Sequence, residues 1–278
     1  MRVPPRTAQI LAVALLGAAT IFTLAVLLFI IAFVLAKGLP SVTWTFLTDK
    51  PRDMGREGGI LPTLVGSVLL PLGAIALALP LGAGTAIYLS EYTRETRFTL
   101  TLRFGTDCLA GIPSIIFGLF GFIFFVVMLK MGWSLLSGAL TLAIMILPTI
   151  IRTSEEAIRA VPRTYREVSY SLGATRWETV LKVVLPNALP GIVTGVMLGI
   201  GRCVGETAAV IFTAGSSMRM PLSAFDSVRT MSVHFYLLAR EGISTEKAYA
   251  TAAVLIITIL LVNLAAYGIL HRVMVRRS

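Results

Sequence analysis

Long segments without any charged side chain are the feature that most constrains this chain. Five of them contain no Asp, Glu, Lys or Arg: 10–36, 60–90, 108–129, 131–151 and 248–270. A bilayer core of about 30 Å is crossed by about 20 residues of helix. A sixth apolar run, 187–217, is interrupted only by Arg202 and Glu206. The pattern predicts an all-α fold, a polytopic integral membrane protein with about six transmembrane helices.

Composition excludes a soluble globule and a disordered chain. Hydrophobic residues make up 56% of the 278 residues and charged residues 14%, whereas soluble domains have about 45–50% and 25%. The formal net charge of +10 does not indicate nucleic acid, because the basic residues gather at the ends of the apolar runs without aromatic residues between them. We expect membrane lipid around the chain and no nucleic-acid partner.

The sequence contains no motif typical of an enzyme or a metal site. The Walker A pattern G-x-x-x-x-G-K-[ST], H-E-x-x-H and G-x-S-x-G do not occur. Cys108 and Cys203 lie inside predicted spans and lack metal-ligand spacing. We predict no catalytic residue, no metal and no cofactor bound by this chain.

Basic residues set the expected orientation in the membrane. The first apolar run is too long for a signal peptide, so we interpret it as an uncleaved span. Arg2 and Arg6 precede the first span, and four basic residues lie within 271–277 after the last. Because basic residues favour the cytoplasmic side, both termini are predicted to be cytoplasmic, as is the arginine-rich connection between the fourth and fifth spans.

That cytoplasmic connection, 152–186, carries repeated signals of helix starts. Three pairs match the Thr-x-x-Glu capping box, Thr153 with Glu156, Thr164 with Glu167, and Thr175 with Glu178. Three short helices are therefore predicted. Gly173 stands where the second should end, and Pro186 where the third closes and the fifth span opens. The loop is expected to be helical and structured.

The fifth span carries two charges at membrane depth, which is costly unless they face protein or water. Arg202 and Glu206 are four residues apart, so on one helix they lie within reach of each other. Gly191, Gly195 and Gly199 fall on the same stripe, which suggests a helix lining a subunit seam or a translocation path. A guanidinium matches tetrahedral oxyanions bidentately. We hypothesise a latch, in which Arg202 exchanges Glu206 for substrate; a purely structural ion pair is the alternative.

Two sizeable external segments, 41–59 and 215–246, are candidates for docking a partner. The apolar residues of 227–240 recur at helical spacing and predict a helix lying along the membrane surface. His234, within it, is interpreted as a surface or packing residue.

The pattern Glu167-Val-Ser-x-x-x-Gly173, nine residues, then Val183-Val-Leu185-Pro186 resembles the EAA loop of ATP-binding-cassette importer permeases. Val168 and Ser169 stand where that family usually has alanines, and Val183 replaces isoleucine. The resemblance implies that the loop forms a coupling element docking on a cytoplasmic ATPase. The residues it assigns to this coupling are Glu167, Gly173, Ala174, Leu185 and Pro186, with Arg152 as a charge at the cytoplasmic mouth.

The segment Gly201-Arg-Cys-Val-Gly205-Glu206-Thr207-Ala208 is similar to the Arg-x-x-Gly-Glu-Thr segment of phosphate-specific transport permeases, although Cys203 stands where a small residue is common. Segments 58–66, 83–92, 111–121 and 147–156 resemble the same family. Between its two paralogous subunits, the continuation to Thr213 looks more like the PstA type than the PstC type. The resemblance implies a substrate pathway at Arg202, Glu206 and Thr207.

The resemblance also implies an assembly and a division of the chain. It implies a PstC-type permease partner, two PstB-type ATP-binding subunits carrying ATP-Mg, and an external PstS-type phosphate-binding protein. The location implied is the bacterial cytoplasmic (inner) membrane. The expected domains are 1–59, the first helix with the first external loop, and 60–278, an importer-type transmembrane domain of five helices that includes loop 152–186.

Three other functions remain open from the sequence. A permease of the same superfamily for sulfate, molybdate or a phosphonate would share the oxyanion chemistry. An ion-coupled secondary transporter also uses intramembrane charge pairs, although no inverted repeat is evident. A scaffold or sensor subunit without a transport path is the third.

Overall fold

The computed structural model describes residues 5–275, and Arg2, Arg276 and Arg277 of the predicted basic tails lie outside them. The fold is all-α, as predicted, with one two-stranded antiparallel ribbon. The α-helices are α1 (Pro5–Gly38), α2 (Trp44–Thr48), α3 (Leu61–Ile87), α4 (Arg97–Ala110), α5 (Ser114–Gly121), α6 (Leu135–Ala160), α7 (Arg163–Ser171), α8 (Arg176–Thr179), α9 (Leu185–Val204), α10 (Ala208–Thr213), α11 (Met231–Arg240) and α12 (Thr245–Val275). The strands are β1 (Pro51–Arg52) and β2 (Glu57–Gly58).

Short 3₁₀ and π-helical turns lie next to several of these helices and between the two strands. The 3₁₀ turns are Leu39–Ser41 and Asp53–Gly55, and the π-helical turns are Tyr88–Tyr92 after α3, Phe122–Met128 after α5, and Val180–Val184 between α8 and α9. Among residues 5–275, five helices are long and apolar enough to cross a membrane, or six if the bent pair formed by α4 and α5 is one span. The predicted number of spans is therefore confirmed.

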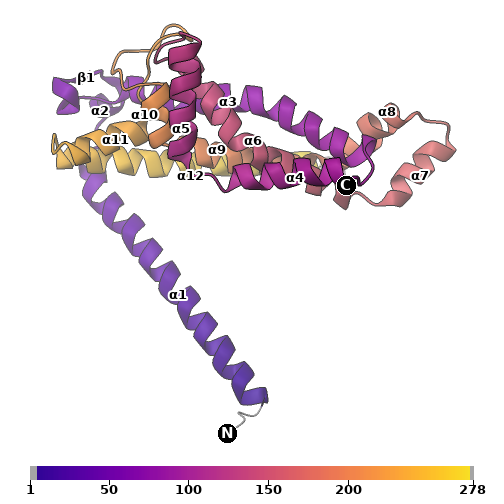
Figure 1. Ribbon diagram of the computed structural model, residues 1–278. Coiled ribbons are helices and arrows are strands. Elements are labelled where there is room, and N and C mark those ends of the chain that lie inside the picture. Colours follow the sequence, from indigo (N-terminus) through magenta and orange to yellow (C-terminus); the bar gives the residue numbers. More distant parts are fainter. Residues whose placement is uncertain (1–4, 276–278) are drawn as a thin grey trace.

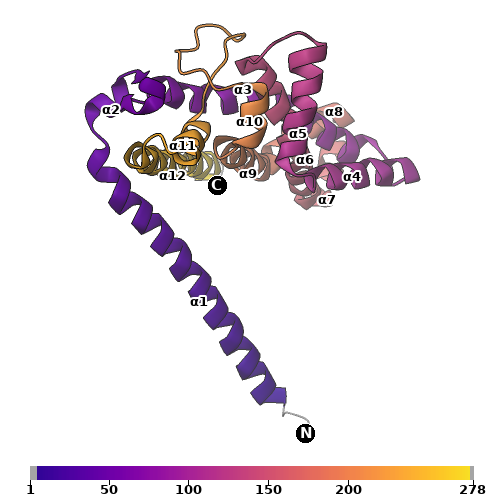
Figure 2. The ribbon, with the colours of Figure 1, turned by 60° about the vertical axis from the view of Figure 1, so that its left-hand side comes forward.

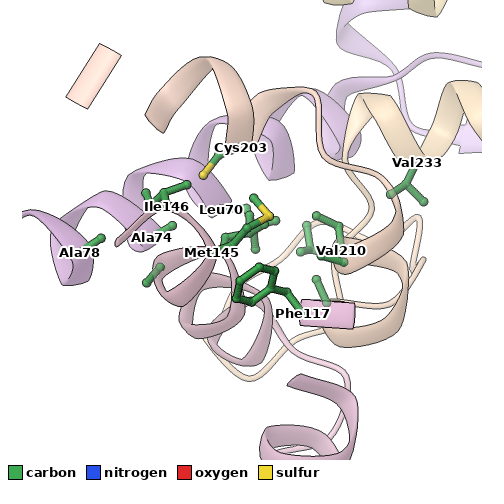
Figure 3. Packing of buried hydrophobic residues seen from close by; sticks show 14 of the residues in the cluster. Leu70, Ala74, Ala78, Phe117, Met145, Ile146, Cys203, Val210 and Val233 are labelled. Carbon is green, nitrogen blue, oxygen red and sulfur yellow. The ribbon is translucent and has the colours of Figure 1, made fainter. Parts of the chain in front are cut away.

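Helices α3, α6 and α9 pack together and form the centre of the bundle, with α12 along its side (Figure 1). The main apolar core joins these helices to α5, α10 and α11, and Figure 3 shows Leu70, Met145, Phe117, Cys203 and Val210 converging there. Small residues permit this approach; a Cβ on Gly82 of α3, for example, would lie 2.7 Å from the side chain of Ile150 on α6.

The predicted third span, 108–129, is not one straight helix. It is divided between α4 and α5, which are bent by 98° relative to each other. The break falls at Gly111-Ile112-Pro113, where Pro113 has no N–H to donate and restricts the residue before it. In Figure 1, α4 runs along the bundle whereas α5 stands across it, next to α10.

The predicted fifth span, 187–217, is also interrupted. Helix α9 ends at Val204, and after α10 no regular element is present from Ala214 to Thr230. At its other end the helix starts earlier than expected, because α8, the π-helical turn and α9 form one continuous span, Arg176–Val204. The third short helix predicted in the cytoplasmic loop is thus the beginning of this span, and Pro186 lies in its interior rather than at its boundary.

Helix α1 stands apart from the bundle, and its apolar surface is exposed over most of its length (Figures 1 and 2). Only its C-terminal end is packed, where Gly38 meets the backbone of Tyr249 and the Phe33 and Tyr249 rings lie 6.0 Å apart. This contact is at the start of α12. The other end of α12 lies at the same end of the bundle as α7 and α8 (Figure 1), so this helix ends on the side of the long loop.

The prediction that a helix within 227–240 lies along the membrane surface is wrong, because this helix packs inside the bundle. Helix α11 begins at Met231 and packs against α12 and α3, with Met231, Val233, His234 and Leu238 buried. A buried serine on α3 anchors its start, because Ser67 Oγ accepts the Met231 N–H at 2.7 Å. His234 is therefore a packing residue.

Candidate functional site

The Arg202–Thr207 segment lies where α9 ends and the chain turns into α10. Arg202 is in the last turn of α9 and is half-buried. Its neighbours Cys203 and Val204 are buried, Cys203 in the main core, so the apolar residues fix the end of this helix. Figure 3 shows Cys203 directed into that core.

Glu206 does not continue α9, so the predicted Arg202–Glu206 pair on one helix face is wrong. Gly205 ends the helix, and Glu206 Oε1 instead accepts the N–H groups of Thr207 and Ala209, each at 3.2 Å. The carboxylate therefore caps the first turn of α10, where unpaired N–H groups favour negative charge. Thr207 is half-buried and its carbonyl accepts the Ile211 N–H.

The Arg202 guanidinium is left without a carboxylate partner. Within residues 5–275 it forms no salt bridge. Since Glu206 is occupied by backbone donors, a planar group with several N–H donors is available at the C-terminal end of α9. Such a group binds an oxyanion in the same way as it binds a carboxylate.

The glycine stripe on α9 faces α6 of the same chain, and not a subunit seam or a translocation path, the two alternatives that we predicted. A Cβ on Gly191 would lie 2.5 Å from the Cβ of Ala157, and one on Gly195 would collide with the side chain of Thr153. Gly199 faces Ile146. The stripe thus brings two helices of one bundle together, which holds the Arg202 end of α9 in place.

The predicted cytoplasmic coupling residues lie at the opposite end of α9. Leu185 and Pro186 form its first turn, and Leu185 packs on a second apolar cluster. From Leu185 to Arg202 the helix rises by about 26 Å. One helix therefore connects the segment 152–186 with the Arg202–Thr207 segment.

Helix α7 presents Glu167 as an exposed side chain and ends in a compact turn. Gly173 has φ +81° and donates to Tyr170 O at 3.0 Å, while Ala174 donates to Ser169 O at 3.2 Å. These two bonds form a Schellman motif, which satisfies the last carbonyls of the helix. The predicted helix end at Gly173 is confirmed.

Only one of the three predicted capping boxes exists. Thr175 and Glu178 form it, with the Thr175 N–H donating to Glu178 Oε2 at 3.0 Å. Thr153 lies inside α6 and donates to Thr149 O, because the apolar face of α6 continues past it to Ala160. The residue before α7 is Pro162 rather than Thr164, and no side chain caps that helix. Residues 152–160 therefore belong to a span, and the loop begins at Val161.

Arg152 is exposed on α6 and pairs with Asp107 of α4 at 2.9 Å and with Glu156 at 3.3 Å. Nearby, Arg103 and Arg159 both contact the buried Glu155, at 2.8 and 3.1 Å. These charges lie beside a cavity of about 700 Å³ at the α7 end of the bundle. Its charged lining is Glu91, Glu95, Arg103, Arg159, Arg163, Arg166, Glu167 and Arg176.

Three charged side chains, an ion pair and a buried arginine, were not identified as functional from the sequence. Glu91 and Arg166 form a buried ion pair at 2.6 Å between the end of α3 and α7. Arg229 is buried before α11 without a carboxylate; its Nε donates to Ser216 O at 2.8 Å, and Nη1 lies 3.3 Å from His234 Nδ1. The sequence offered one signal for the ion pair, because Glu91 is the first charged residue after the uncharged run 60–90. Within residues 5–275 no group of three or more His, Cys, Asp or Glu side chains is placed to hold a metal ion.

A second cavity of about 600 Å³ lies beside the C-terminal end of α10. Its lining includes the aromatic side chains of Phe122, Trp133 and Phe212 and the hydroxyl groups of Ser216, Ser217 and Ser227. Hydroxyl groups at this end of the bundle add hydrogen-bond donors on the side opposite α7.

Comparison with known proteins gives consistent matches over most of the chain. The family model described as "Binding-protein-dependent transport system inner membrane component" matches residues 78–277. A probable ABC transporter permease of Bacillus subtilis (strain 168), YqgI, is 33% identical over 272 residues, 92% of each chain. The phosphate transport system permease PstA of Pasteurella multocida (strain Pm70) is 32% identical over 252 residues, 89% of each chain.

A solved structure supports the fold. The bacterial alginate ABC transporter in complex with alginate pentasaccharide-bound periplasmic protein includes a chain that aligns with a TM-score of 0.71 over 96% of both chains. At 14% sequence identity this match concerns the arrangement of helices and not the transported substrate.

Proposed function

We propose that this chain, which belongs to the family of binding-protein-dependent transport system inner membrane components, is the PstA-type subunit that carries inorganic phosphate. The chain is a permease subunit of an ABC importer in the bacterial inner membrane. Such permeases work with ATPase subunits and a periplasmic binding protein and are not themselves enzymes. The identity of the substrate and of the individual partners is the proposal.

The Arg202 guanidinium is the observation that carries the assignment of an oxyanion. It is half-buried at the end of α9 and has no ion pair within residues 5–275, and Glu206, four residues further along the chain, accepts two backbone N–H groups instead. A tetrahedral dianion would supply the charge that this guanidinium lacks and would accept two parallel N–H bonds. Glu206 would then keep the anion from binding too tightly by like-charge repulsion.

The opposite end of α9 fits the role of the coupling element. Exposed Glu167 on α7, the Gly173 turn with Ala174, and the half-buried Leu185-Pro186 start of α9 lie toward the same end of the bundle. We propose that this end of the bundle docks on two PstB-type subunits that bind ATP-Mg. A PstC-type permease and a PstS-type binding protein would complete the transporter. This chain would contribute two structural parts, 1–59 and 60–278.

ATP-dependent uptake of labelled phosphate into vesicles tests this function. The vesicles contain the chain with its candidate permease partner, ATPase and binding protein. Arg202→Gln is expected to abolish uptake while the complex still assembles, and Arg202→Lys to retain a small part, because a lysine is a point charge without the planar fork. Arg97→Gln, which removes an exposed charge at the start of α4, outside both the Arg202–Thr207 segment and the segment 152–186, is the matched control and should transport normally.

Competition and energy dependence separate the alternatives in the same assay. Uptake that requires ATP and ignores excess sulfate or molybdate supports a phosphate permease. Inhibition by either competitor at equal concentration would assign another oxyanion. Uptake by the purified chain alone, driven by an ion gradient, would replace the proposal with secondary transport.

A further inference from the structure

We infer that the buried ion pair between Glu91 and Arg166 is the joint through which movement of α7 is passed to α3. The inference rests on the proposed function in one respect only, that α7 is the surface moved by the ATPase. It assigns both residues as positioning residues, because neither lies in the Arg202–Thr207 segment.

The geometry of Arg166 is that of a junction between three elements. From α7, its Nη2 donates to Glu91 Oε1 at 2.6 Å and its Nε to the same oxygen at 3.1 Å. The remaining donors reach the end of α6, where Nη2 meets Ile158 O at 2.9 Å and Nη1 meets Val161 O at 2.7 Å. One guanidinium thus binds a carboxylate of α3 and the last carbonyls of α6 at once.

Burial makes this junction different from the other cytoplasmic ion pairs. The side chains of Arg166 and Glu91 are 16% and 7% exposed, whereas those of Arg152 and Asp107 are 61% and 54% exposed. A buried charge pair is screened little by salt, and loss of one partner leaves the other uncompensated. The two elements therefore stay together during any movement that does not break the pair.

The position of Glu91 connects the junction to the bundle core. Glu91 lies in the π-helical turn that follows α3, and α3 packs along α6 and α9. The wide turn directs the carboxylate toward α7, while Leu89 beside it is buried. Displacement of α7 would consequently move the end of a helix that supports the Arg202 segment through α9.

Two variants and one control test the joint by comparing transport with ATP hydrolysis. Glu91→Gln keeps the side-chain shape but removes the charge, and Arg166→Lys keeps the charge but cannot reach both carboxylate and carbonyls. For each, phosphate transported per ATP hydrolysed is expected to fall about 2- to 30-fold, the range for loss of coupling between sites. Arg97→Gln, at an exposed arginine outside the junction and outside the segment 152–186, should leave the ratio unchanged.

A purely structural role gives a different result. It would lower assembly, ATP hydrolysis and uptake together and would leave their ratio as in the wild type, which would overturn the inference. Normal ratios in both variants would overturn it as well. Glu91→Asp, which restores the charge, should recover part of the coupling.

A distance measurement tests the joint without reference to the substrate. Spin labels replace Tyr88 on the π-helical turn and Thr164 on α7, both exposed, in a Cys108→Ser background with cysteine-free partner subunits. In the wild type the distance should stay narrow with and without ATP, and in Glu91→Gln it should broaden on ATP addition. Equal distributions would refute the joint, whereas absence of phosphate uptake by the wild type would refute only the proposed function.

Discussion

The close contact between α6 and α9 makes Gly195→Ala a demanding test of the bundle. A Cβ at this position would lie 2.9 Å from the Thr153 Cβ and even closer to its hydroxyl. Thr153 is not free to move aside, because its hydroxyl donates to Thr149 O at 2.8 Å. Overpacking of this kind costs about 1–3 kcal/mol, and the lost hydrogen bond about 1 kcal/mol more.

Alanine's better helix propensity offsets about 1 kcal/mol of this cost. We therefore expect a net loss of about 2 kcal/mol, which corresponds to about 4–8 °C in Tm for a domain of this size. The assay is thermal unfolding in detergent with a thiol-reactive fluorogenic dye, in a Cys108→Ser background. Cys203 on α9 is then the one thiol that can react with the dye, and its side chain is 1% exposed in the folded protein. Dye fluorescence therefore rises when α9 separates from the bundle.

Gly201→Ala is the control in the same helix. A Cβ there meets nothing within 4 Å, so its Tm should stay unchanged or rise by a few degrees. Equal Tm values for the two variants would refute the close approach of α6 and α9. A Thr153→Ala change should recover part of the loss caused by Gly195→Ala.

Two further predictions concern pH and the end of α7. Burial, with a smaller contribution from the Arg229 charge, lowers the pKa of His234 to about 4, so its neutral form stabilises the fold above pH 6.5 and this stability is lost as pH falls from about 6.5 to 4. The loss is at most about 3 kcal/mol; Tm measured across this range should fall less steeply in His234→Gln, and identical slopes would contradict the prediction. Gly173→Ala should destabilise the α7 end by about 1–2 kcal/mol through its φ of +81° alone, since a Cβ there meets nothing within 4 Å; Gly173→Asn should cost less, and equal Tm values for wild type and Gly173→Ala would contradict it.

The sequence was sufficient for the features that depend on local composition. Uncharged runs predicted the number of spans, and Gly173 was identified from its place at the end of the second helix predicted in the loop. Both signals are local, because hydrophobic length and positive φ are properties of a few adjacent residues.

The errors arose where a local signal competes with tertiary packing. Thr153 and Glu156 match a capping box, yet the apolar face of α6 continues through them and packs on α9. Arg202 and Glu206 have the spacing of a helical pair, but Gly205 ends the helix and the carboxylate binds α10. The Glu91–Arg166 pair joins residues 75 positions apart, which no periodicity in a single sequence reveals.

The π-helical turn at Val180–Val184 sets the angular phase between the two ends of the span Arg176–Val204. A π turn contains one residue more than an α turn, and each residue advances an α-helix by about 100°. Loss of one residue here, with the helix kept continuous, would rotate Arg202 by about 100° relative to α7. The length of this segment, and not only its residue types, therefore determines the direction in which the guanidinium is presented.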